Sequence, residues 1–151
     1  MSTPEATLST SDRIDIAELV ARFAHCSDYG DWRALAGCFT DDVVTCIAGA
    51  PASVGVAAQV EHARASDEWT EGQNRHLALN LWIEPDGADA ARARYYLINF
   101  VAGKELFAAR IVLSARMTDH VVRTAAGWRI ARRELEPDQP FAAPDMGPGA
   151  T

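Results

Sequence analysis

The first part of the chain places apolar side chains at helical spacing. Small polar residues occupy the chain up to about Thr10, and Ser11 is placed to cap a helix that ends near Asp28 to Gly30. Within it, apolar side chains recur every three or four residues. They are Ile16, Leu19, Val20, Phe23 and Ala24. We therefore predict an amphipathic first helix that follows a flexible tail over residues 1–10.

Two shorter helices and one strand are expected next. Asp31 can cap a helix whose apolar side starts at Trp32 and which ends at residues 40–42. Residues 43–47 then have the pattern of a short strand. A loop rich in Gly, Ala and Pro leads to a third helix at about residues 56–65, whose apolar stripe is mostly Ala and Val.

From Asn74 onward the apolar period changes from helical to alternating, which is typical of β-strands. Turn signals at residues 85–87, 102–104 and 125–127 divide this part of the chain. The pattern predicts four long strands in antiparallel succession.

The first of these strands has no simply polar face. One face is apolar, whereas the other mixes small, aromatic and polar side chains. The two faces carry Leu77, Leu79, Leu81 and Ile83, and His76, Ala78, Asn80, Trp82 and Glu84. A mixed face of this kind is more typical of a pocket wall than of a surface in bulk water.

The order of the elements predicts the architecture. Helices followed by a long curled sheet are typical of an α+β fold, with the N-terminal helices packed on a mostly antiparallel sheet. We expect this single domain over residues 11–136, followed by a Pro/Gly-rich tail over residues 137–151. Because the helices cover one face of the sheet, we expect the other face to pack on a second copy of the chain in a homo-oligomer.

The amino-acid composition limits the kinds of reaction and ligand that we expect for this chain. The 151 residues include 14 basic and 21 acidic side chains, which gives a formal net charge of -7. Lys104, in a predicted turn, is the single lysine, so it is the one candidate for Schiff-base chemistry or a lysine phosphate clamp. No Lys/Arg run is dense enough to bind nucleic acid or anionic lipid through a bulk field.

Targeting and metal-binding signals are missing from the sequence. The N-terminus lacks a basic segment followed by an apolar one, and no apolar run approaches the roughly 18 residues of a membrane span. Three cysteines without a CxxC pair are typical of a reduced protein. His25, Cys26 and Asp28 are too close in a helix to converge on one ion. We expect a cytoplasmic protein with no membrane contact, no metal site and no cofactor.

Three side chains are candidates for catalysis. They are Asp28 at the end of the first helix, His76 on the first long strand and Arg133 on the last. An imidazole in an apolar pocket is a natural proton acceptor, and a carboxylate on its far nitrogen fixes the tautomer. From the residues alone, an interior histidine, a turn carboxylate and an ion-paired arginine are the structural alternatives. His62 and His120 are predicted to be solvated or capping residues.

Three stretches of the chain, in combination with this order of elements, are diagnostic of a known fold. They are IAELVARFAHCSDYGDWRALAGCFTDDVV, RHLALNLWIEPDGADAARARYYL and VVRTAAGWRIARRELEP. With them the chain, from about Arg13 to Pro140, resembles the SnoaL-like branch of the nuclear-transport-factor-2-like superfamily. That branch includes scytalone dehydratase, bile acid 7-alpha-dehydratase, hexachlorocyclohexane dehydrochlorinase and polyketide cyclases. The resemblance implies a cone-shaped α+β barrel with a deep pocket, and a trimer in preference to a dimer.

The resemblance also implies roles for individual residues. Asp28 and His76 fall where the dehydratases and the dehydrochlorinase keep the aspartate and histidine of their catalytic dyad. Asn80 matches a frequent pocket asparagine, and Arg133 falls where the dehydrochlorinase has its pocket arginine. By this resemblance, Arg133 and Asn80 stabilise negative charge that develops on oxygen or halide.

One position departs from the family pattern. Phe23 stands where several dehydratases have a tyrosine that activates the carbonyl or the leaving group. Tyr29, Tyr95 or Tyr96 could replace it from another wall, although alternation puts Tyr95 and Tyr96 on opposite faces of their strand. The residues that we expect to contact substrate are Phe23, Tyr29, Asn80, Trp82 and Tyr96.

The leading interpretation is a cofactor-independent lyase or isomerase. In it, His76 abstracts a carbon-bound proton from a small apolar or polycyclic substrate while Asp28 holds the imidazole. Two alternatives stay open. The same pocket could serve a polyketide-type cyclase or an epoxide hydrolase, or the chain could be a non-catalytic subunit similar to the beta subunit of ring-hydroxylating dioxygenases, which supports a metal-bearing partner.

Overall fold

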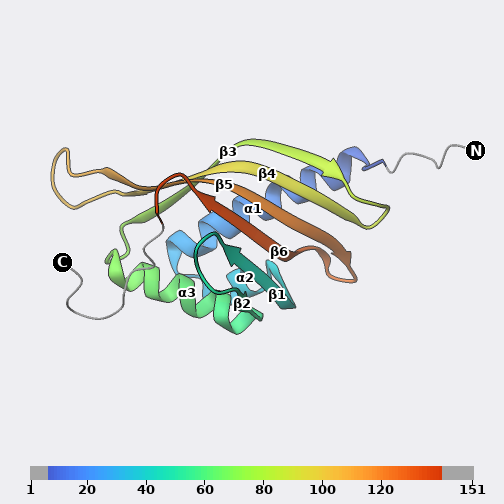
Figure 1. The fold of residues 1–151 in the computed structure, drawn as a ribbon, viewed down its shortest axis with the longest axis horizontal. Coiled ribbons are helices and arrows are strands. Elements are labelled where there is room, and N and C mark those ends of the chain that lie inside the picture. The colour runs from blue at the N-terminus through green and yellow to red at the C-terminus, as the bar shows by residue number, and fades with distance from the viewer. Residues whose placement is uncertain (1–6, 141–151) are drawn as a thin grey trace, which may run out of the picture.

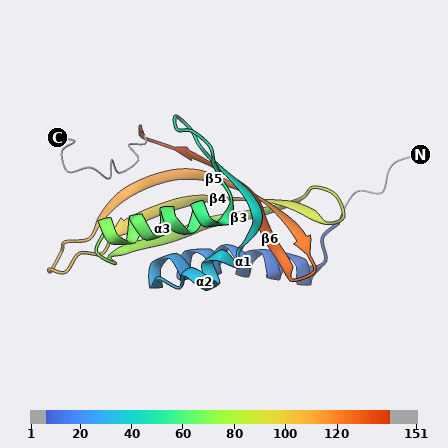
Figure 2. The same cartoon turned by 90° about the horizontal axis from the view of Figure 1, so that it is seen from below.

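The computed structural model describes residues 7–140, so residues 1–6 and 141–151 of the predicted tails lie outside the described residues. In the described part, three helices and one six-stranded sheet form the predicted α+β fold (Figure 1). The sheet curls over the helices, which lie together on its concave side (Figure 2). The helices are α1 (Thr10–Tyr29), α2 (Trp32–Ala36) and α3 (Val56–Trp69).

The sheet has the strand order β2-β1-β6-β5-β4-β3. Its strands are β1 (Phe39–Ile47), β2 (Ser53–Val54), β3 (Asn74–Pro85), β4 (Ala90–Val101), β5 (Arg110–Thr124) and β6 (Gly127–Pro137). Neighbouring strands are antiparallel except β1 and β6, which are parallel. The predicted succession of four antiparallel strands is therefore confirmed. The short strand β2, which the sequence pattern did not predict, extends the sheet beyond β1.

Helix α1 starts with a cap two residues earlier than predicted. Ser9, not Ser11, is the N-cap: its hydroxyl accepts a hydrogen bond from the backbone N–H of Asp12 at 3.1 Å, and the Asp12 carboxylate accepts one from the backbone N–H of Ser9 at 3.1 Å. This reciprocal pair is a capping box. Leu8 is already buried, so the predicted flexible tail is structured from Leu8 onward. Gly30 ends the helix with φ 67°, which glycine adopts without strain.

Four other boundaries differ from the prediction. The second helix ends at Ala36, and β1 already begins at Phe39 because this residue pairs with the parallel strand β6. Helix α3 continues to Trp69, beyond the predicted end at residue 65. Strand β5 begins at Arg110 rather than directly after the turn at residues 102–104, because Phe107 has φ 62° and cannot continue a regular strand.

Asn80 interrupts the alternation of β3. Its φ is 57°, and the pairing register with β4 shifts between Leu79 and Trp82. Asparagine is one of the few residues besides glycine that tolerate this left-handed conformation. The inserted residue makes a β-bulge, a feature that bends the strand and redirects the side chains that follow it.

The bulge exchanges the two faces of β3. Ala78 packs on the core before the bulge, whereas Leu81 and Ile83 do so beyond it. Trp82 is 68% exposed and points away from the helices. The prediction that one unbroken alternation runs through this strand is therefore wrong beyond Asn80, because a single extra residue reverses the period of two.

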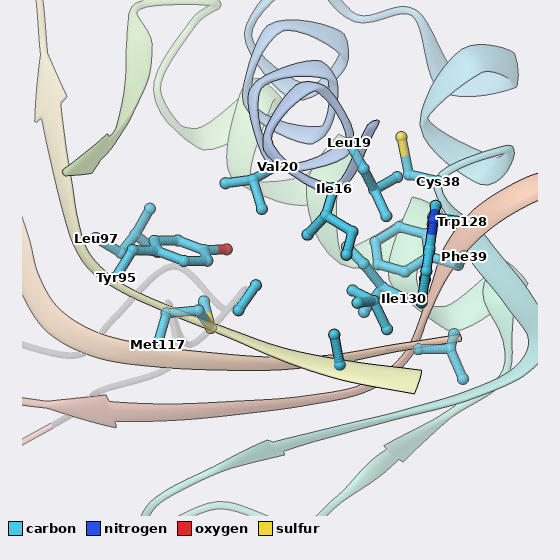
Figure 3. Close-up of a cluster of buried hydrophobic side chains, with 14 of the residues drawn as sticks. Ile16, Leu19, Val20, Cys38, Phe39, Tyr95, Leu97, Met117, Trp128 and Ile130 are labelled. Carbon is cyan, nitrogen blue, oxygen red and sulfur yellow. The ribbon is translucent and has the colours of Figure 1, made fainter. Parts of the chain in front are cut away.

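The hydrophobic core lies between α1 and the inner face of β4, β5 and β6 (Figure 3). Its labelled side chains are Ile16, Leu19 and Val20 of α1, Cys38, Phe39 of β1, Tyr95 and Leu97 of β4, Met117 of β5, and Trp128 and Ile130 of β6. Burial of each large aliphatic side chain contributes roughly 1.5–3 kcal/mol, so this layer fixes α1 on the sheet. It thereby positions the last turn of α1, which carries Asp28.

Candidate active site

The end of α1 and the start of β3 bring Asp28 and His76 into contact. The Nδ1 atom of His76 lies 2.6 Å from Oδ1 of Asp28, and the backbone N–H of His76 donates to Oδ2 at 3.0 Å. The two side chains, of His76 and Asp28, are 14% and 11% exposed, respectively. Since both carboxylate oxygens are engaged by the same strand residue, Asp28 is held at two points. The structure thus brings the two residues of the predicted dyad together.

This contact determines which nitrogen of His76 is free. A neighbouring carboxylate accepts a hydrogen bond, so the proton of the neutral imidazole belongs on Nδ1. Nε2 then carries a lone pair, and within residues 7–140 it makes no hydrogen bond. An imidazole in this state can take a proton at Nε2, and the carboxylate of Asp28 stabilises the imidazolium that results.

Phe23 packs its ring against the imidazole. The ring centroids of Phe23 and His76 are 5.8 Å apart and their planes meet at 71°, which is an edge-to-face contact. Phe23 makes a similar contact with Phe39, with centroids 6.0 Å apart and planes at 76°. Position 23 therefore offers no hydroxyl to a substrate, and its ring restrains the orientation of the imidazole instead.

Arg133 is buried in an ion pair, which was the structural alternative for this residue, and the sequence pattern did not identify its partner Asp119. Its Nε and Nη2 atoms donate to the two carboxylate oxygens of Asp119 at 2.7 and 2.8 Å. The Tyr95 hydroxyl donates to Asp119 at 2.8 Å and lies 3.3 Å from Nη2 of Arg133. Asp119 is 0% exposed and Arg133 is 4% exposed. The three side chains form a polar network inside the core.

The network keeps Arg133 charged and Tyr95 neutral. Burial alone lowers the pKa of Arg133, but the charge and hydrogen bonds of Asp119 outweigh burial, so this pKa is raised overall. Burial, followed by the charge of Asp119, raises the pKa of Tyr95 well above its usual value. The positive charge that the family resemblance assigns to the pocket is thus paired with Asp119 in the core. The sequence contained one indication of this pair: Asp119 stands between Met117 and Val121 on the otherwise apolar face of β5.

Phe23 lies between Arg133 and His76. The guanidinium carbon of Arg133 is 3.7 Å from the ring centroid of Phe23, and it is 5.5 Å from that of Phe39. These are cation–π distances. Since the same Phe23 ring meets the imidazole edge-on, Arg133 can influence His76 by holding this ring in place.

Four of the predicted substrate-binding residues are exposed, and three of these lie on the outer face of the sheet. Tyr29 is 82% exposed at the end of α1. Asn80, Trp82 and Tyr96 line a groove of about 820 Å³ on the outer face of the sheet. The bulge turns residue 82 outward, and Tyr96 alternates with the buried Tyr95. The expectation of a shared pocket with His76 is therefore corrected for Asn80, Trp82 and Tyr96.

Asn99 is a neighbour of the dyad that the sequence analysis missed. It lies directly opposite His76 in the pairing of β3 with β4, and it is 9% exposed. Residues paired in this way have side chains on the same face of the sheet. The alternation of Tyr95, Leu97 and Asn99 along β4 could have identified it as an inward-facing polar residue.

His62 is a second histidine on the side of the dyad. Its side chain is exposed on α3, as expected for a solvated residue. However, burial, followed by the charge of His76, lowers the pKa of His62. The two imidazoles are therefore near enough for their charges to interact.

The cysteines offer little nucleophilic chemistry. Cys26 and Cys38 are buried, Cys46 is partly buried, and all three are free thiols. Burial raises the pKa of Cys26, and it raises the pKa of Cys38 to about 11. Buried thiols of this kind stay protonated and unreactive at neutral pH.

Two further properties concern the described residues only. Between residues 7 and 140 no group of three or more His, Cys, Asp or Glu side chains is arranged to hold a metal ion. None of the helices in this part of the chain combines the length and apolar character needed to cross a membrane.

The family model for the SnoaL-like domain matches residues 9–134. The chain belongs to the SnoaL-like family. A solved NTF2-like protein with a cystatin-like fold from Novosphingobium aromaticivorans is 26% identical, has a TM-score of 0.77, and matches over 88% of this chain and 86% of that chain. Aln2 from a Streptomyces species is 25% identical, with a TM-score of 0.76 over 87% of this chain and 94% of that chain.

A candidate scytalone dehydratase from Novosphingobium aromaticivorans is 19% identical, with a TM-score of 0.73 over 87% of this chain and 89% of that chain. At this identity the likeness establishes the fold alone. No curated protein sequence matches the chain. The SnoaL-like family and its NTF2-like fold, expected from the resemblance, are thus confirmed.

Proposed function

We propose that the chain is a cofactor-independent lyase or isomerase in which His76 removes a proton from carbon. The observation that supports this most directly is the two-point contact with Asp28, which orients the imidazole and leaves Nε2 free. An imidazole held by a carboxylate in this way is suited to act as a general base. A histidine with a purely structural role in the interior would be expected to pair both nitrogens.

The proposed reaction begins at a C–H bond next to a carbonyl group. Nε2 of His76 takes the proton, and the electron pair of that bond forms an enolate. In an elimination, a hydroxyl on the next carbon leaves with its bonding pair and receives the proton from the imidazolium, which yields water and a C=C bond. In an isomerisation, the proton returns to a different carbon. Asp28 stabilises the imidazolium between these steps.

The surroundings of His76 favour a small apolar or polycyclic substrate. Phe23 contacts the imidazole, and Leu97 and Leu113 lie on the same inner face beside Asn99. Apolar walls of this kind bind rings and exclude water from the base. Dehydration is the first reaction to test, because the imidazolium formed at His76 can return its proton to a leaving hydroxyl.

The alternatives have less support from this site. Epoxide hydrolysis needs a further carboxylate to activate water, and the buried Asp119 is engaged by Arg133 and Tyr95. A subunit that only supports a catalytic partner needs no oriented dyad, whereas Asp28 and His76 are held at two points.

Deuterium exchange at carbon 2 of 1-tetralone tests proton removal by itself, because this ketone carries no leaving group. In D₂O the wild-type chain is expected to accelerate the exchange, and His76→Gln is expected to lose about 10²- to 10⁴-fold of the rate. Dehydration of 3-hydroxy-1-tetralone to 1-naphthol and water, followed by absorbance, then tests elimination.

His25→Gln is the matched control, because it removes an exposed imidazole from the same neighbourhood of α1. This variant is expected to keep the wild-type rate of exchange. Equal exchange rates for the wild-type chain and His76→Gln would show that His76 is not the base.

A further inference from the structure

Asn99 places an amide on the inner face of the sheet beside His76. The two residues are directly paired between β4 and β3, so their side chains lie on the same face. The neighbours of Asn99 on this face are apolar, with Leu97 two residues earlier on β4 and Leu113 opposite it on β5. A leucine at position 99 would continue this apolar surface.

The amide of Asn99 has no partner in the described part of the chain. The residue is 9% exposed, and its Oδ1 atom is buried without a hydrogen bond. Neither end of the amide takes part in a hydrogen bond between residues 7 and 140. The Oδ1 atom of Asn74, on the same face of β3, is also buried without a hydrogen bond, but the Nδ2 atom of Asn74 reaches the Ser66 hydroxyl at 3.4 Å, so one end of that amide is paired. Buried polar groups in folded proteins nearly always have a hydrogen-bond partner. We therefore expect the amide of Asn99 to bind a partner from outside the chain.

We propose that Asn99 binds a hydroxyl group of the substrate, and that this contact makes the site selective for hydroxyl-bearing apolar rings. This inference rests on the proposed function, which places the substrate next to His76. An amide offers one acceptor and a donor group, and a hydroxyl complements both, whichever way the amide is turned. A halogen or a hydrocarbon substituent cannot accept and donate in this way. Asn99 therefore favours substrates that can lose water over substrates that lose halide.

Two probes that differ only in the group of interest test this selectivity. They are 2-naphthol and 2-methylnaphthalene, in which a hydroxyl and a methyl group occupy the same place. Their dissociation constants can be measured through the quenching of tryptophan fluorescence. The wild-type chain is expected to bind 2-naphthol at least tenfold more tightly, because methylnaphthalene leaves the amide unpaired.

Asn99→Leu is expected to bring the ratio of the two dissociation constants close to one, mainly by weakening the binding of 2-naphthol. Asn99→Ala provides a second variant if the larger side chain disturbs the fold, which circular dichroism will show. Asn80→Gly is the matched control: it removes an asparagine amide from the outer face while keeping a residue that accepts φ 57°. This control is expected to retain the wild-type ratio.

A tenfold preference that persists in both Asn99 variants would overturn the proposal, as would a wild-type chain that binds neither probe or binds both equally. The His76→Gln variant separates this result from the proposed function. It is expected to lose exchange of 1-tetralone while keeping the preference for 2-naphthol. Failure of His76 as the base therefore appears in the exchange rate, and failure of Asn99 appears in the ratio of dissociation constants.

Discussion

Asp119 and Arg133 form a two-point ion pair across β5 and β6, with Nε–Oδ1 and Nη2–Oδ2 distances of 2.7 and 2.8 Å. The guanidinium group of Arg133 also lies 3.7 Å from the centroid of the Phe23 ring. That ring meets His76 edge-on at 5.8 Å. The buried ion pair is therefore connected to the candidate base through a single aromatic ring.

Removal of one member of this pair is expected to destabilise the fold strongly. Arg133→Met or Asp119→Asn should each lower the free energy of unfolding by about 3–5 kcal/mol, because the remaining charged group stays buried without its partner. The double variant Asp119→Leu/Arg133→Met should be more stable than either single variant. Urea unfolding measures all three.

The exposed pair of Arg116 with Glu136 provides the control for this experiment. Its side chains are 67% and 63% exposed, and Arg116→Met should change the free energy of unfolding by no more than about 1 kcal/mol. If Arg133→Met were equally mild, the buried pair would not support the core.

Asp28→Asn tests the orientation of the imidazole. An amide at position 28 can donate to Nδ1, which moves the imidazole proton to Nε2 and removes the base from the substrate side. We expect the exchange rate of 1-tetralone to fall by about 10³- to 10⁴-fold. Asp31→Asn is the control, because asparagine caps the N-terminus of α2 as well as aspartate does. A wild-type rate in Asp28→Asn would mean that the carboxylate does not set the tautomer.

The sequence identified the dyad but not its surroundings. Alternation placed His76 on the inner face because it precedes the bulge, and the family resemblance placed Asp28 at the end of a helix that Gly30 terminates. The outward direction of Trp82 was not predictable, because a pattern of apolar and polar residues does not reveal that Asn80 has a positive φ. The partner of Arg133 was missed because ion pairing between β5 and β6 depends on register.

The bulge itself can be tested at Asn80. Asn80→Val should lower the free energy of unfolding by about 1–2 kcal/mol, because a β-branched residue is strained at φ 57°. Asn80→Gly should stay close to the wild-type value, since glycine adopts this conformation freely. Leu77→Val, at a regularly paired position of the same strand, should have an effect within about 0.5 kcal/mol. Equal stability of the Val and Gly variants at position 80 would argue against the bulge.

The outer face of the sheet is the surface expected to pack on a second copy of the chain. Leu79 and Tyr96 are paired across β3 and β4 on this face and are 45% and 52% exposed, beside Trp82 at 68%. Exposed apolar clusters of this kind are typical of interfaces. Light scattering at micromolar concentration should show an oligomer, with a trimer favoured by the family resemblance.

A charge in the middle of this surface should disrupt the oligomer. Tyr96→Glu is expected to yield a folded monomer, because burial of an unpaired carboxylate is costly. Tyr29→Glu, at a residue that is 82% exposed on α1, should leave the oligomer intact. A wild-type chain that is monomeric in solution would remove the proposed interface.

Acid stability should depend on Asp12, which ties the start of α1 to the sheet. Its carboxylate accepts hydrogen bonds from Arg123 at 2.7 Å and from the indole of Trp128 at 3.2 Å, besides its contacts with Ser9. The hydrogen bond from Arg123, followed by that from Ser9, lowers the pKa of Asp12 below its ordinary value of 3.8. The folded chain therefore binds fewer protons than the unfolded chain as the pH falls below about 4.

The stabilisation from Asp12 is consequently present above pH 3.8 and is lost as the pH falls toward the lower pKa of the folded chain. Asp12→Asn should be less stable than the wild-type chain at pH 7, and this difference should shrink between pH 4 and pH 2 in unfolding measurements at each pH. Asp15→Asn, at an exposed position of the same helix, should track the wild-type profile. A difference between wild type and Asp12→Asn that is constant over this range would show that the loss arises from packing, because only a charge-dependent contact titrates.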